Sequence, residues 1–498
     1  MADDNITDLD EVRKRRQQGL KELDEAKLEE AIATGQAELS KLIERFNKDF
    51  IVANEGGKVW VMRWRQDPAM KREVLERISY RDFLLMFDNR KLTILGKDPR
   101  SGKPVEVTKS HAQWWWESPN RKQFLGGVTF DPAGQPPKSY LNLWRGFKVK
   151  TEKGDWSLMR AHIEKPLCSG NREHADYVLD WMARAVQCPN EPGEVALVFR
   201  GIKGCGKGIF GRWFTSLFGQ HGMQIFSSVQ LVGRFNDHLR DCIALFADEA
   251  FFAGDKQHEG ILKGLITEPY LAVEGKYLRL APAPNMLHLI IASNSEWIIP
   301  ASHDERRYAV WDVPDTYVGN LPYFDAIDRQ MKSGGLAAML YDLQNLDIRN
   351  FNFRAVPQTE GLKVQKQLSL DTRDRWWLDV LQRGYVWRSR HGIADFRAWG
   401  EFCTTQLLHA SYLQWCADNR IARPENNVAL GRRMTEIYSR TRPRSTNIVA
   451  ELETWPPNAT MDDLVIRAHH MPGYALGSLE EARARFADVR GVEGDWRE

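Results

Sequence analysis

Apolar and polar positions divide the chain into regions of different periodicity. Residues 1–50 are rich in Glu, Lys and Ala and place apolar side chains at roughly helical spacing, which predicts a helical arm. Alternating positions around Gly56 and Gly57 then predict a hairpin, which starts a small mixed α/β module over residues 51–155. Residues 156–190 return to helical spacing and end at the breaker CPNEPGE.

Three short apolar runs, each followed by polar residues, lie within residues 191–325. Runs of this kind are typical of buried parallel strands, so we expect an α/β domain with a parallel sheet. Residues 326–370 are expected to form a helical segment and a linker, with an exposed connection at QTEGLKVQKQLSLDTRDR. A last domain is expected over residues 371–498, in which residues 404–444 have the pattern helix, turn, helix. The expected fold class is therefore multidomain α/β.

Composition agrees with several soluble domains. A chain of 498 residues exceeds the size at which a single hydrophobic core stops growing. Apolar residues make up 43% and charged residues 27%, and no apolar run reaches membrane-spanning length. The start, MADDNITDLDEVRKRR, has no apolar signal core, so we expect a cytoplasmic protein that does not enter membranes.

Cysteines, charge and tryptophans narrow the chemistry further. The six cysteines show neither a CxxC pair nor the ligand spacing of a zinc site. A formal net charge of +2 leaves any binding of nucleic acid to local basic surfaces. The 18 tryptophans can stack on bases but more often fill cores, so none is taken as a binding residue.

The run VALVFR is followed at once by GIKGCGKG and then by a segment with helical spacing. A strand, a glycine loop and a helix in this order are the context of a phosphate-binding loop, which is favoured over a simple glycine-rich turn. The glycines let amide N–H groups turn toward an anion, and Lys207 is expected to reach the outer phosphates of ATP. The residues expected to bind the nucleotide are Gly201, Ile202, Lys203, Gly204, Cys205, Gly206, Lys207, Gly208 and Ile209.

The loop departs from the usual motif at Gly208, where Ser or Thr normally supplies a hydroxyl to magnesium. Either a water replaces that hydroxyl, or ATP hydrolysis is impaired. Any metal must therefore depend on other residues.

Two further motifs follow the loop in the chain. IALFADEA is an apolar strand that ends in Asp248 and Glu249. We expect this strand to neighbour the strand of the phosphate loop, so that Asp248 holds Mg²⁺ and Glu249 lies beside the attacking water. LHLIIASN ends at Asn294, which is expected to orient the water or to sense the γ-phosphate. Acidic pairs and turn asparagines are common after strands, and the order of the three motifs is what favours catalysis.

These motifs resemble those of superfamily 3 helicases, a branch of the AAA+ ATPases, because GIKGCGKG, FADE and IIASN lie close together in the chain. The nearest likeness is to phage and prophage primase-helicase ATPases similar to the poxvirus type. The resemblance implies an AAA+ P-loop ATPase core, ATP and Mg²⁺ as cofactors, and a winged-helix C-terminal domain. No primase active site is matched, so a primase, if the system uses one, is expected on a separate chain.

The resemblance also implies residues that act between subunits and on DNA. In that family, a hairpin between the acidic motif and the sensor strand holds DNA in the ring channel. VEGKYLRL lies in this interval, which implies that Lys276 and Arg279 contact DNA, although an ordinary surface hairpin has the same pattern. The family supplies an arginine to the nucleotide of the neighbouring subunit, which implies this role for Arg306 or Arg307.

A cluster of arginines marks the last domain. Its members are opposed only by Glu436, which suits contact with DNA phosphates, and a solvated basic helix explains the cluster equally well. The cluster consists of Arg432, Arg433, Arg440, Arg442 and Arg444.

The leading hypothesis is an ATP-dependent DNA helicase of phage or plasmid replication. It is expected to form a homo-oligomeric ring, a hexamer, that moves on single-stranded or forked DNA in the cytoplasm of a bacterial host. One alternative is an AAA+ remodeller or loader, against which the hairpin lysine and the arginine cluster argue. Another is a weakly hydrolysing, nucleotide-stabilised DNA-binding scaffold, which Gly208 favours.

Overall fold

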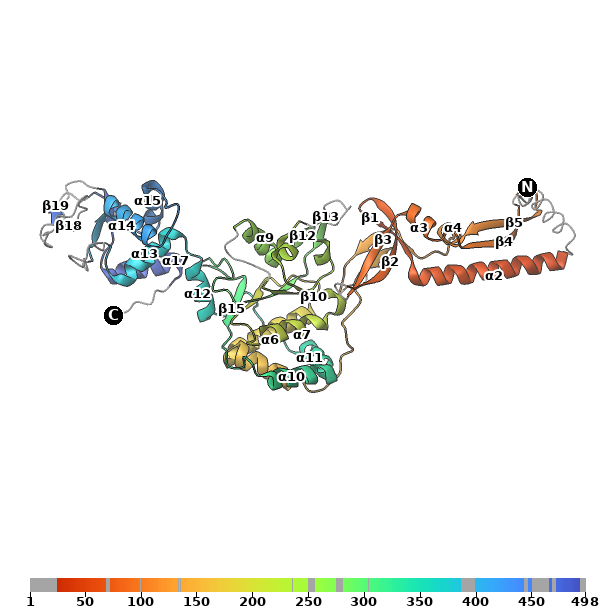
Figure 1. The fold of residues 1–498 in the computed structure, drawn as a ribbon, viewed down its shortest axis with the longest axis horizontal. Coiled ribbons are helices and arrows are strands. Elements are labelled where there is room, and N and C mark those ends of the chain that lie inside the picture. Colours follow the sequence, from red (N-terminus) through yellow and green to blue (C-terminus); the bar gives the residue numbers. More distant parts are fainter. Residues whose placement is uncertain are drawn as a thin grey trace, which may run out of the picture.

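The molecule is elongated and has three parts, an N-terminal module, a central α/β domain and a C-terminal domain (Figure 1). The computed structural model describes residues 25–68, 72–98, 100–132, 134, 136–234, 236–249, 256–274, 281–302, 304–386, 399–442, 447–449, 465–467 and 472–492.

The N-terminal module is built on a four-stranded sheet of order β3-β2-β1-β6. Strands β1 and β2 form the predicted hairpin, whose turn residues Gly56 and Gly57 have φ of +61° and +76°. Glycine adopts these left-handed values readily, and tight two-residue hairpin turns require them. The elements are α2 (Glu25–Asp49), β1 (Ile51–Glu55), β2 (Lys58–Asp67), β3 (Arg72–Ile78) and β6 (Gln123–Phe124).

A second hairpin, β4–β5, runs beside α2 and lengthens the module (Figure 1). Trp115 is fully buried, and its indole N–H donates to Asn47 Oδ1 at 2.8 Å. This tryptophan therefore belongs to the core. The elements are α3 (Tyr80–Met86), β4 (Lys91–Lys97), β5 (Pro104–Ser110), α4 (His111–Glu117), β7 (Gly127–Thr129) and β8 (Tyr140–Asn142).

Ion pairs join the N-terminal module to the central domain. Arg72 lies 3.1 Å from Asp241, and both side chains are largely buried. Arg77 and Arg240 both bind the carboxylate of Glu55. Burial alone would raise the pKa of Glu55, but these two guanidinium groups hold it below its usual value.

The central domain contains a five-stranded parallel sheet of order β10-β11-β14-β9-β15, as the apolar runs predicted. The expectation that the strand of Asp248 neighbours the strand of the phosphate loop is wrong, because β14 lies between β11 and β9. The order of strands depends on the crossover connections, and apolar runs do not encode it. The strands are β9 (Ala196–Arg200), β10 (Gly222–Ile225), β11 (Ala244–Asp248), β14 (His288–Ser293) and β15 (Tyr308–Asp312).

Helices cover both faces of this sheet (Figure 1). Helix α7 packs on β10 and β11, and α6 packs on α11, all on one side, while α9 lies on the other side with the β12–β13 pair. The elements are α5 (Ser157–His162), α6 (Arg172–Gln187), α7 (Lys207–Leu217), α8 (Ser228–Val232), α9 (Lys256–Thr267), β12 (Tyr270–Val273), β13 (Ala281–Pro284), α10 (Leu321–Gln330) and α11 (Leu336–Asn345).

The exposed connection expected over residues 358–375 is wrong. It contains helix α12 (Glu360–Leu368), which packs on β15. Gln365 is fully buried, donates to the carbonyl of Glu296 at 2.7 Å and accepts from the amide of Ile298 at 2.8 Å. Polar side chains in this segment satisfy buried backbone groups, so a polar composition did not indicate exposure here.

The C-terminal domain packs helices around a small sheet of order β16-β20-β17. Trp376 and Trp377 are buried and donate to Ser411 Oγ and Tyr438 Oη at 3.1 and 3.0 Å, so both fill the core. The elements are α13 (Thr372–Arg383), β16 (Phe402–Thr404), α14 (Thr405–Asp418), α15 (Asn427–Thr435), β17 (Arg440–Thr441), β18 (Asn447–Val449), β19 (Val465–Arg467), β20 (Gly473–Ala475) and α17 (Leu479–Arg490).

All six cysteines are free thiols. Within the described ranges, no helix combines the length and the apolar character needed to cross a membrane.

Candidate nucleotide-binding site

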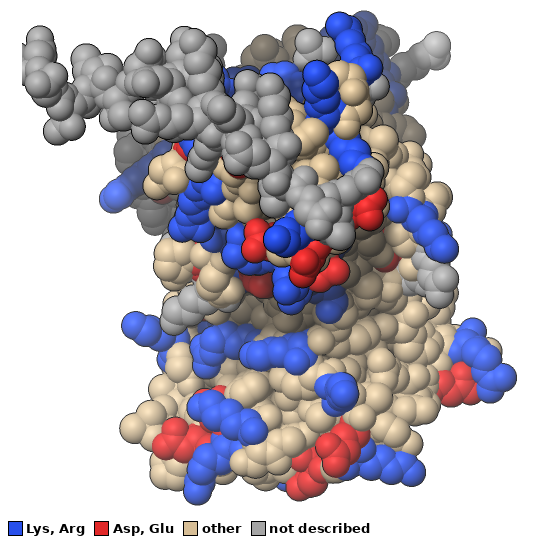
Figure 2. All heavy atoms as spheres, turned by 90° about the vertical axis from the view of Figure 1, so that its right-hand side faces the viewer, with Lys and Arg blue, Asp and Glu red and all other residues tan. Residues whose placement is uncertain are grey.

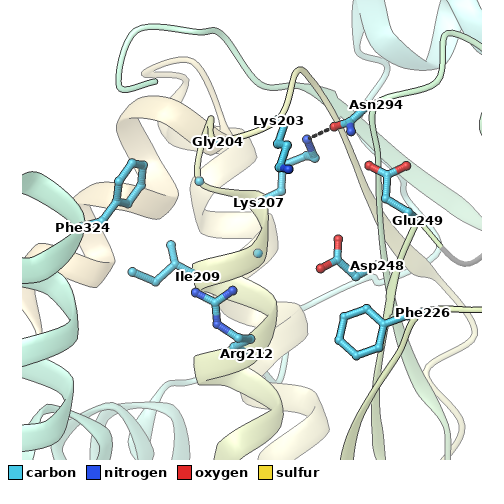
Figure 3. A pocket seen from close by; sticks show the side chains of 12 residues that line it. Lys203, Gly204, Lys207, Ile209, Arg212, Phe226, Asp248, Glu249, Asn294 and Phe324 are labelled. Atoms are coloured by element: carbon cyan, nitrogen blue, oxygen red, sulfur yellow. Dashed lines mark hydrogen bonds between the residues drawn. The ribbon is translucent and has the colours of Figure 1, made fainter. Parts of the chain in front are cut away.

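A cavity of about 580 Å³ opens at the carboxyl ends of β9, β11 and β14 (Figure 3). The carboxyl ends of parallel strands meet at one edge of a sheet, where ligands of α/β proteins usually bind. This topology brings the three sequence motifs together. The cavity is lined by Lys203, Gly204, Gly206, Lys207, Gly208, Ile209, Arg212, Phe226, Asp248, Glu249, Asn294 and Phe324.

The phosphate-binding loop connects β9 to α7. Gly206 precedes α7 with φ of +109°, and a Cβ at this position would lie 2.4 Å from the ring of His162, so only glycine fits. Of the nine residues predicted to bind the nucleotide, Gly201, Ile202 and Cys205 do not line the cavity. Cys205 is buried beneath the loop.

Lys207 is held inside the loop. Its Nζ donates to the carbonyl of Gly201 at 2.5 Å, to the carbonyl of Ile202 at 3.1 Å and to Asn294 Oδ1 at 3.0 Å. Figure 3 shows the bond to Asn294, which joins the phosphate loop to the end of β14. Phosphate oxygens would be stronger partners for this ammonium than neutral oxygens, because both groups carry charge.

Asp248 ends β11 and faces the cavity (Figure 3). Gln224, at the end of the neighbouring β10, donates to Asp248 Oδ2 at 3.0 Å. Burial raises the pKa of Asp248, and the adjacent Glu249 raises it further. A partly desolvated carboxylate with a single amide donor fits Mg²⁺, which takes oxygen ligands and binds proteins through one or two carboxylates together with substrate phosphates.

Glu249 has an unusual backbone conformation. Its φ is +55°, in the left-handed region that residues other than glycine rarely adopt. Ser293 Oγ donates to Glu249 Oε2 at 3.1 Å, and the Glu249 amide donates to the carbonyl of Ala292 at 2.9 Å. Backbone strain of this kind costs about 1–3 kcal/mol and occurs most often at functional sites.

His162 contacts the phosphate-binding loop through its imidazole ring, and no feature of the sequence indicated this role. Its Nε2 lies 3.1 Å from the carbonyl of Gly206, which can only accept, and its Nδ1 lies 3.0 Å from Tyr323 Oη. Burial lowers the pKa of His162 to about 4, so the ring is neutral at pH 7. Gln224 and Ser293 were missed as well, although Ser293 directly precedes Asn294.

The structure distinguishes Arg306 from Arg307, the two arginines predicted to act on the nucleotide of the neighbouring subunit. Tyr308, which follows them, pairs with Ala196 at the start of β9, whereas the phosphate loop follows the end of that strand. Arg306 and Arg307 therefore lie at the opposite edge of the sheet from their own nucleotide site. Arg306 is exposed, but Arg307 is half-buried and lies 3.4 Å from the buried Glu305.

The predicted DNA contacts have different surroundings. Lys276 and Arg279 lie outside the described residues. Arg432 and Arg440 are exposed. Arg433 instead binds the buried carboxylate of Asp374, so its positive charge is neutralised inside the domain.

A second cavity, of about 620 Å³, lies in the N-terminal module. Figure 2 views the molecule from the end of this module and shows Lys and Arg on both sides of a hollow, with acidic side chains among them. Arg145 lies 5.0 Å over the ring of Trp64 and 3.4 Å from Glu73. We call this cavity the basic groove; its charged lining residues are Lys48, Arg63, Arg65, Lys122, Arg145, Asp49 and Glu73.

Comparison with known proteins adds a family match and structural relatives. Residues 199–307, which carry the phosphate loop, the acidic pair and the arginine pair, match a protein family of unknown function, DUF5906. The DNA primase-polymerase of Nitratiruptor phage NrS-1 is 23% identical over 253 residues, which cover 47% of this chain and 34% of that protein. The match therefore spans about a third of the relative's length.

The structural likeness extends over most of the chain. One structure of the C-terminal region of NrS-1 has a TM-score of 0.56 at 15% identity and covers 86% of this chain and 98% of that region. Another has a TM-score of 0.55 at 14% identity, with the same coverage. At this identity, the likeness shows a shared fold.

Proposed function

We propose that the protein is an ATP-hydrolysing motor that acts on DNA in phage-type replication. The single observation that carries this proposal is the convergence of Lys207, Asp248, Glu249 and Asn294 on one cavity, at the amino end of α7. A lysine, two acids and a polar residue at the end of a third strand are what hydrolysis of a nucleoside triphosphate requires.

The chain's own residues divide the work of hydrolysis. The phosphates bind at the amino end of α7, where Lys207 exchanges its carbonyl partners for phosphate oxygens. Asp248 holds Mg²⁺, which supplies positive charge to the phosphates when it is bound. Glu249 accepts a proton from the attacking water, and Asn294 orients that water.

The other end of the cavity suits the base. Phe324 lies across the cavity from Asp248, on the far side of Ile209 (Figure 3). Aromatic and aliphatic side chains of this kind provide the apolar contacts that a purine ring makes.

Two surfaces support DNA as the track. The basic groove presents Lys48, Arg65 and Lys122, and the C-terminal domain presents Arg432 and Arg440. Lysines and arginines bind the phosphate backbone without regard to sequence. The α14–α15 pair and the antiparallel pairing of β18 with β19 support the proposed winged-helix domain. The phage relative is named a primase-polymerase, which fits a role beside DNA synthesis.

We further propose a closed ring, a hexamer, in which Arg306 reaches the nucleotide of the next subunit. Its position at the edge of the sheet opposite its own phosphate loop supports action on the neighbouring subunit. A head-to-tail contact repeats until it closes. Arg306 is favoured over Arg307 because Glu305 engages Arg307.

Steady-state phosphate release tests the proposed hydrolysis. Lys207→Ala should lower turnover by about 10²- to 10³-fold, since it removes a donor aimed at developing phosphate charge. Lys332→Ala, an exposed lysine on the turn that follows α10, serves as the matched control. Equal turnover in both variants would contradict the role of residues 201–209 as a phosphate-binding loop. Bound ATP without turnover in the wild type would favour the scaffold that Gly208 suggests.

Subunit mixing tests the arginine in trans. Lys207→Ala and Arg306→Ala should each be inactive alone, but a mixed ring contains interfaces at which both residues are intact. The mixture should therefore recover part of the turnover. No recovery, in rings shown by mass measurement to contain both variants, would contradict a shared site.

A further inference from the structure

Arg212 lies one helical turn beyond Gly208, the position at which the phosphate loop departs from its usual motif. Residues four apart in a helix lie on the same face. A Cβ built on Gly208 would lie 3.2 Å from Arg212 Nη1, closer than an ordinary van der Waals contact. A side chain on residue 208 would therefore meet the guanidinium, which would have to shift by a few tenths of an ångström to make room for it.

The guanidinium of Arg212 is available to a ligand. Arg212 is exposed and reaches into the cavity between Phe324 and Asp248 (Figure 3). Within the part of the chain that the structure describes, no hydrogen bond or ion pair engages its guanidinium, although its positive charge also acts on Asp328 of α10. Burial raises the pKa of Asp248, and the positive charge of Arg212 opposes that rise, so the two groups interact electrostatically across the cavity.

We propose that Arg212 binds the phosphates of ATP from within the same subunit and that Gly208 leaves room for it. This inference rests on the proposed function and names the residue through which the same site recognises its nucleotide. A guanidinium presents five N–H donors in a planar fork that matches pairs of phosphate oxygens, and it keeps its charge at any physiological pH. Arg212 thus supplies part of the positive charge that a conventional loop draws from its metal.

If Arg212 binds the phosphates, nucleotide binding should depend less on Mg²⁺ than it does in a protein whose phosphate-binding loop contains Ser or Thr. A conventional loop holds the triphosphate together with the metal, whereas the charge on Arg212 is fixed to the chain. A structural role for Arg212 predicts something different. If Arg212 only positioned Asp248, its loss would affect binding in the presence of Mg²⁺ and not in its absence.

Binding of a fluorescent ATP analogue, measured by anisotropy in EDTA and again in Mg²⁺, distinguishes these roles. Arg212→Ala should weaken binding in EDTA by about ten- to a hundredfold, the effect of losing charge-assisted hydrogen bonds. Arg212→Lys keeps the charge but loses the fork and should fall between. Arg329→Ala is the control, because Arg329 lies on the neighbouring α10 and does not line the cavity. This variant should bind the analogue as the wild type does.

A reciprocal substitution tests the relation to Gly208. In Arg212→Ala, the guanidinium beside Gly208 is gone, so Gly208→Ser can add the usual hydroxyl without displacing it. The double variant should recover binding in Mg²⁺ but remain weak in EDTA. Recovery under neither condition would contradict the proposed exchange of roles between the two positions.

The outcomes for Arg212 and for the site as a whole are separable. Unchanged binding by Arg212→Ala in EDTA, or a loss confined to Mg²⁺, would overturn the role of Arg212. If Lys207→Ala binds the analogue as well as the wild type does, the nucleotide site itself fails. If Lys207→Ala binds less well, the site stands, whatever Arg212 does. Thermal unfolding identifies a variant that does not fold, and Arg212→Lys then carries the test.

Discussion

The central α/β domain and the C-terminal domain both concentrate charged residues, but they use the charges differently. In the central domain, Lys207 at the start of α7 and the adjacent Asp248 and Glu249 at the end of β11 face one cavity. In the C-terminal domain, Arg433 and Arg490 surround the carboxylate of Asp374, whose side chain is 1% exposed. The first arrangement leaves charges for a ligand, while the second neutralises them within the fold. A run of arginines therefore indicates DNA contact only where no acidic partner is buried beside it.

The largest expected effect is on ATP turnover, and it is compared between one glutamate in each domain. Glu249→Gln should lower ATP turnover by about 10²- to 10⁴-fold but retain ATP binding, because the amide keeps the shape and cannot accept the proton. Glu436→Gln alters a glutamate paired with Arg433 and Arg490 in the C-terminal domain and should leave turnover unchanged. Phosphate release and analogue binding measure both. Similar turnover in the two variants would mean that Glu249 is not the base.

Neighbouring arginines sharpen the comparison within the C-terminal domain. Arg433→Ala should lower the free energy of unfolding by about 1–3 kcal/mol, since the buried Asp374 loses one of its partners. The exposed Arg432→Ala should change it by less than about 0.5 kcal/mol. Urea unfolding followed by tryptophan fluorescence compares them. Equal stability of the two variants would show that Arg433 is not structural.

The sequence indicated the nucleotide site because its residues follow apolar strands in a fixed order. Parallel topology forces the carboxyl ends of such strands to one edge, so Asp248 and Asn294 reach the cavity although the order of their strands was wrongly expected. His162 and Gln224 approach the site from distant segments, and no local pattern indicates such contacts. Arg212 lies four residues after Gly208, a spacing that places both on one face of a helix. Only the structure shows that the guanidinium of Arg212 turns toward that glycine.

Acidification tests the support that His162 gives to the phosphate loop. The pKa of His162 is about 4 in the fold and near 6.5 when the chain is unfolded. Between these values, the unfolded chain binds more protons, so the free energy of unfolding falls as pH falls from 6.5 toward 4. His162→Gln should make that fall smaller by about 2 kcal/mol. His409→Gln, the same substitution at a histidine of the C-terminal domain, serves as the control. An unaltered pH dependence in His162→Gln would contradict a buried neutral ring.

The smallest expected effect concerns the basic groove. Lys48→Glu with Lys122→Glu should weaken binding of single-stranded DNA and reduce the slope of log K against log salt by about two, one for each contact. Lys27→Glu with Lys41→Glu makes the same change in charge on α2, outside the groove. Fluorescence anisotropy over a salt series compares the pairs. Equal slopes would place the DNA path elsewhere, with the exposed Arg432 and Arg440 as the next candidates.

The central claim is that ATP hydrolysis drives work on DNA, and one measurement tests it most directly. Phosphate release by the wild-type chain is followed with and without single-stranded DNA, beside Lys207→Ala under the same conditions. We predict turnover that rises several-fold with DNA and falls by about 10²- to 10³-fold in Lys207→Ala. Turnover that DNA does not change, or no turnover while ATP binds normally, would contradict a motor on DNA.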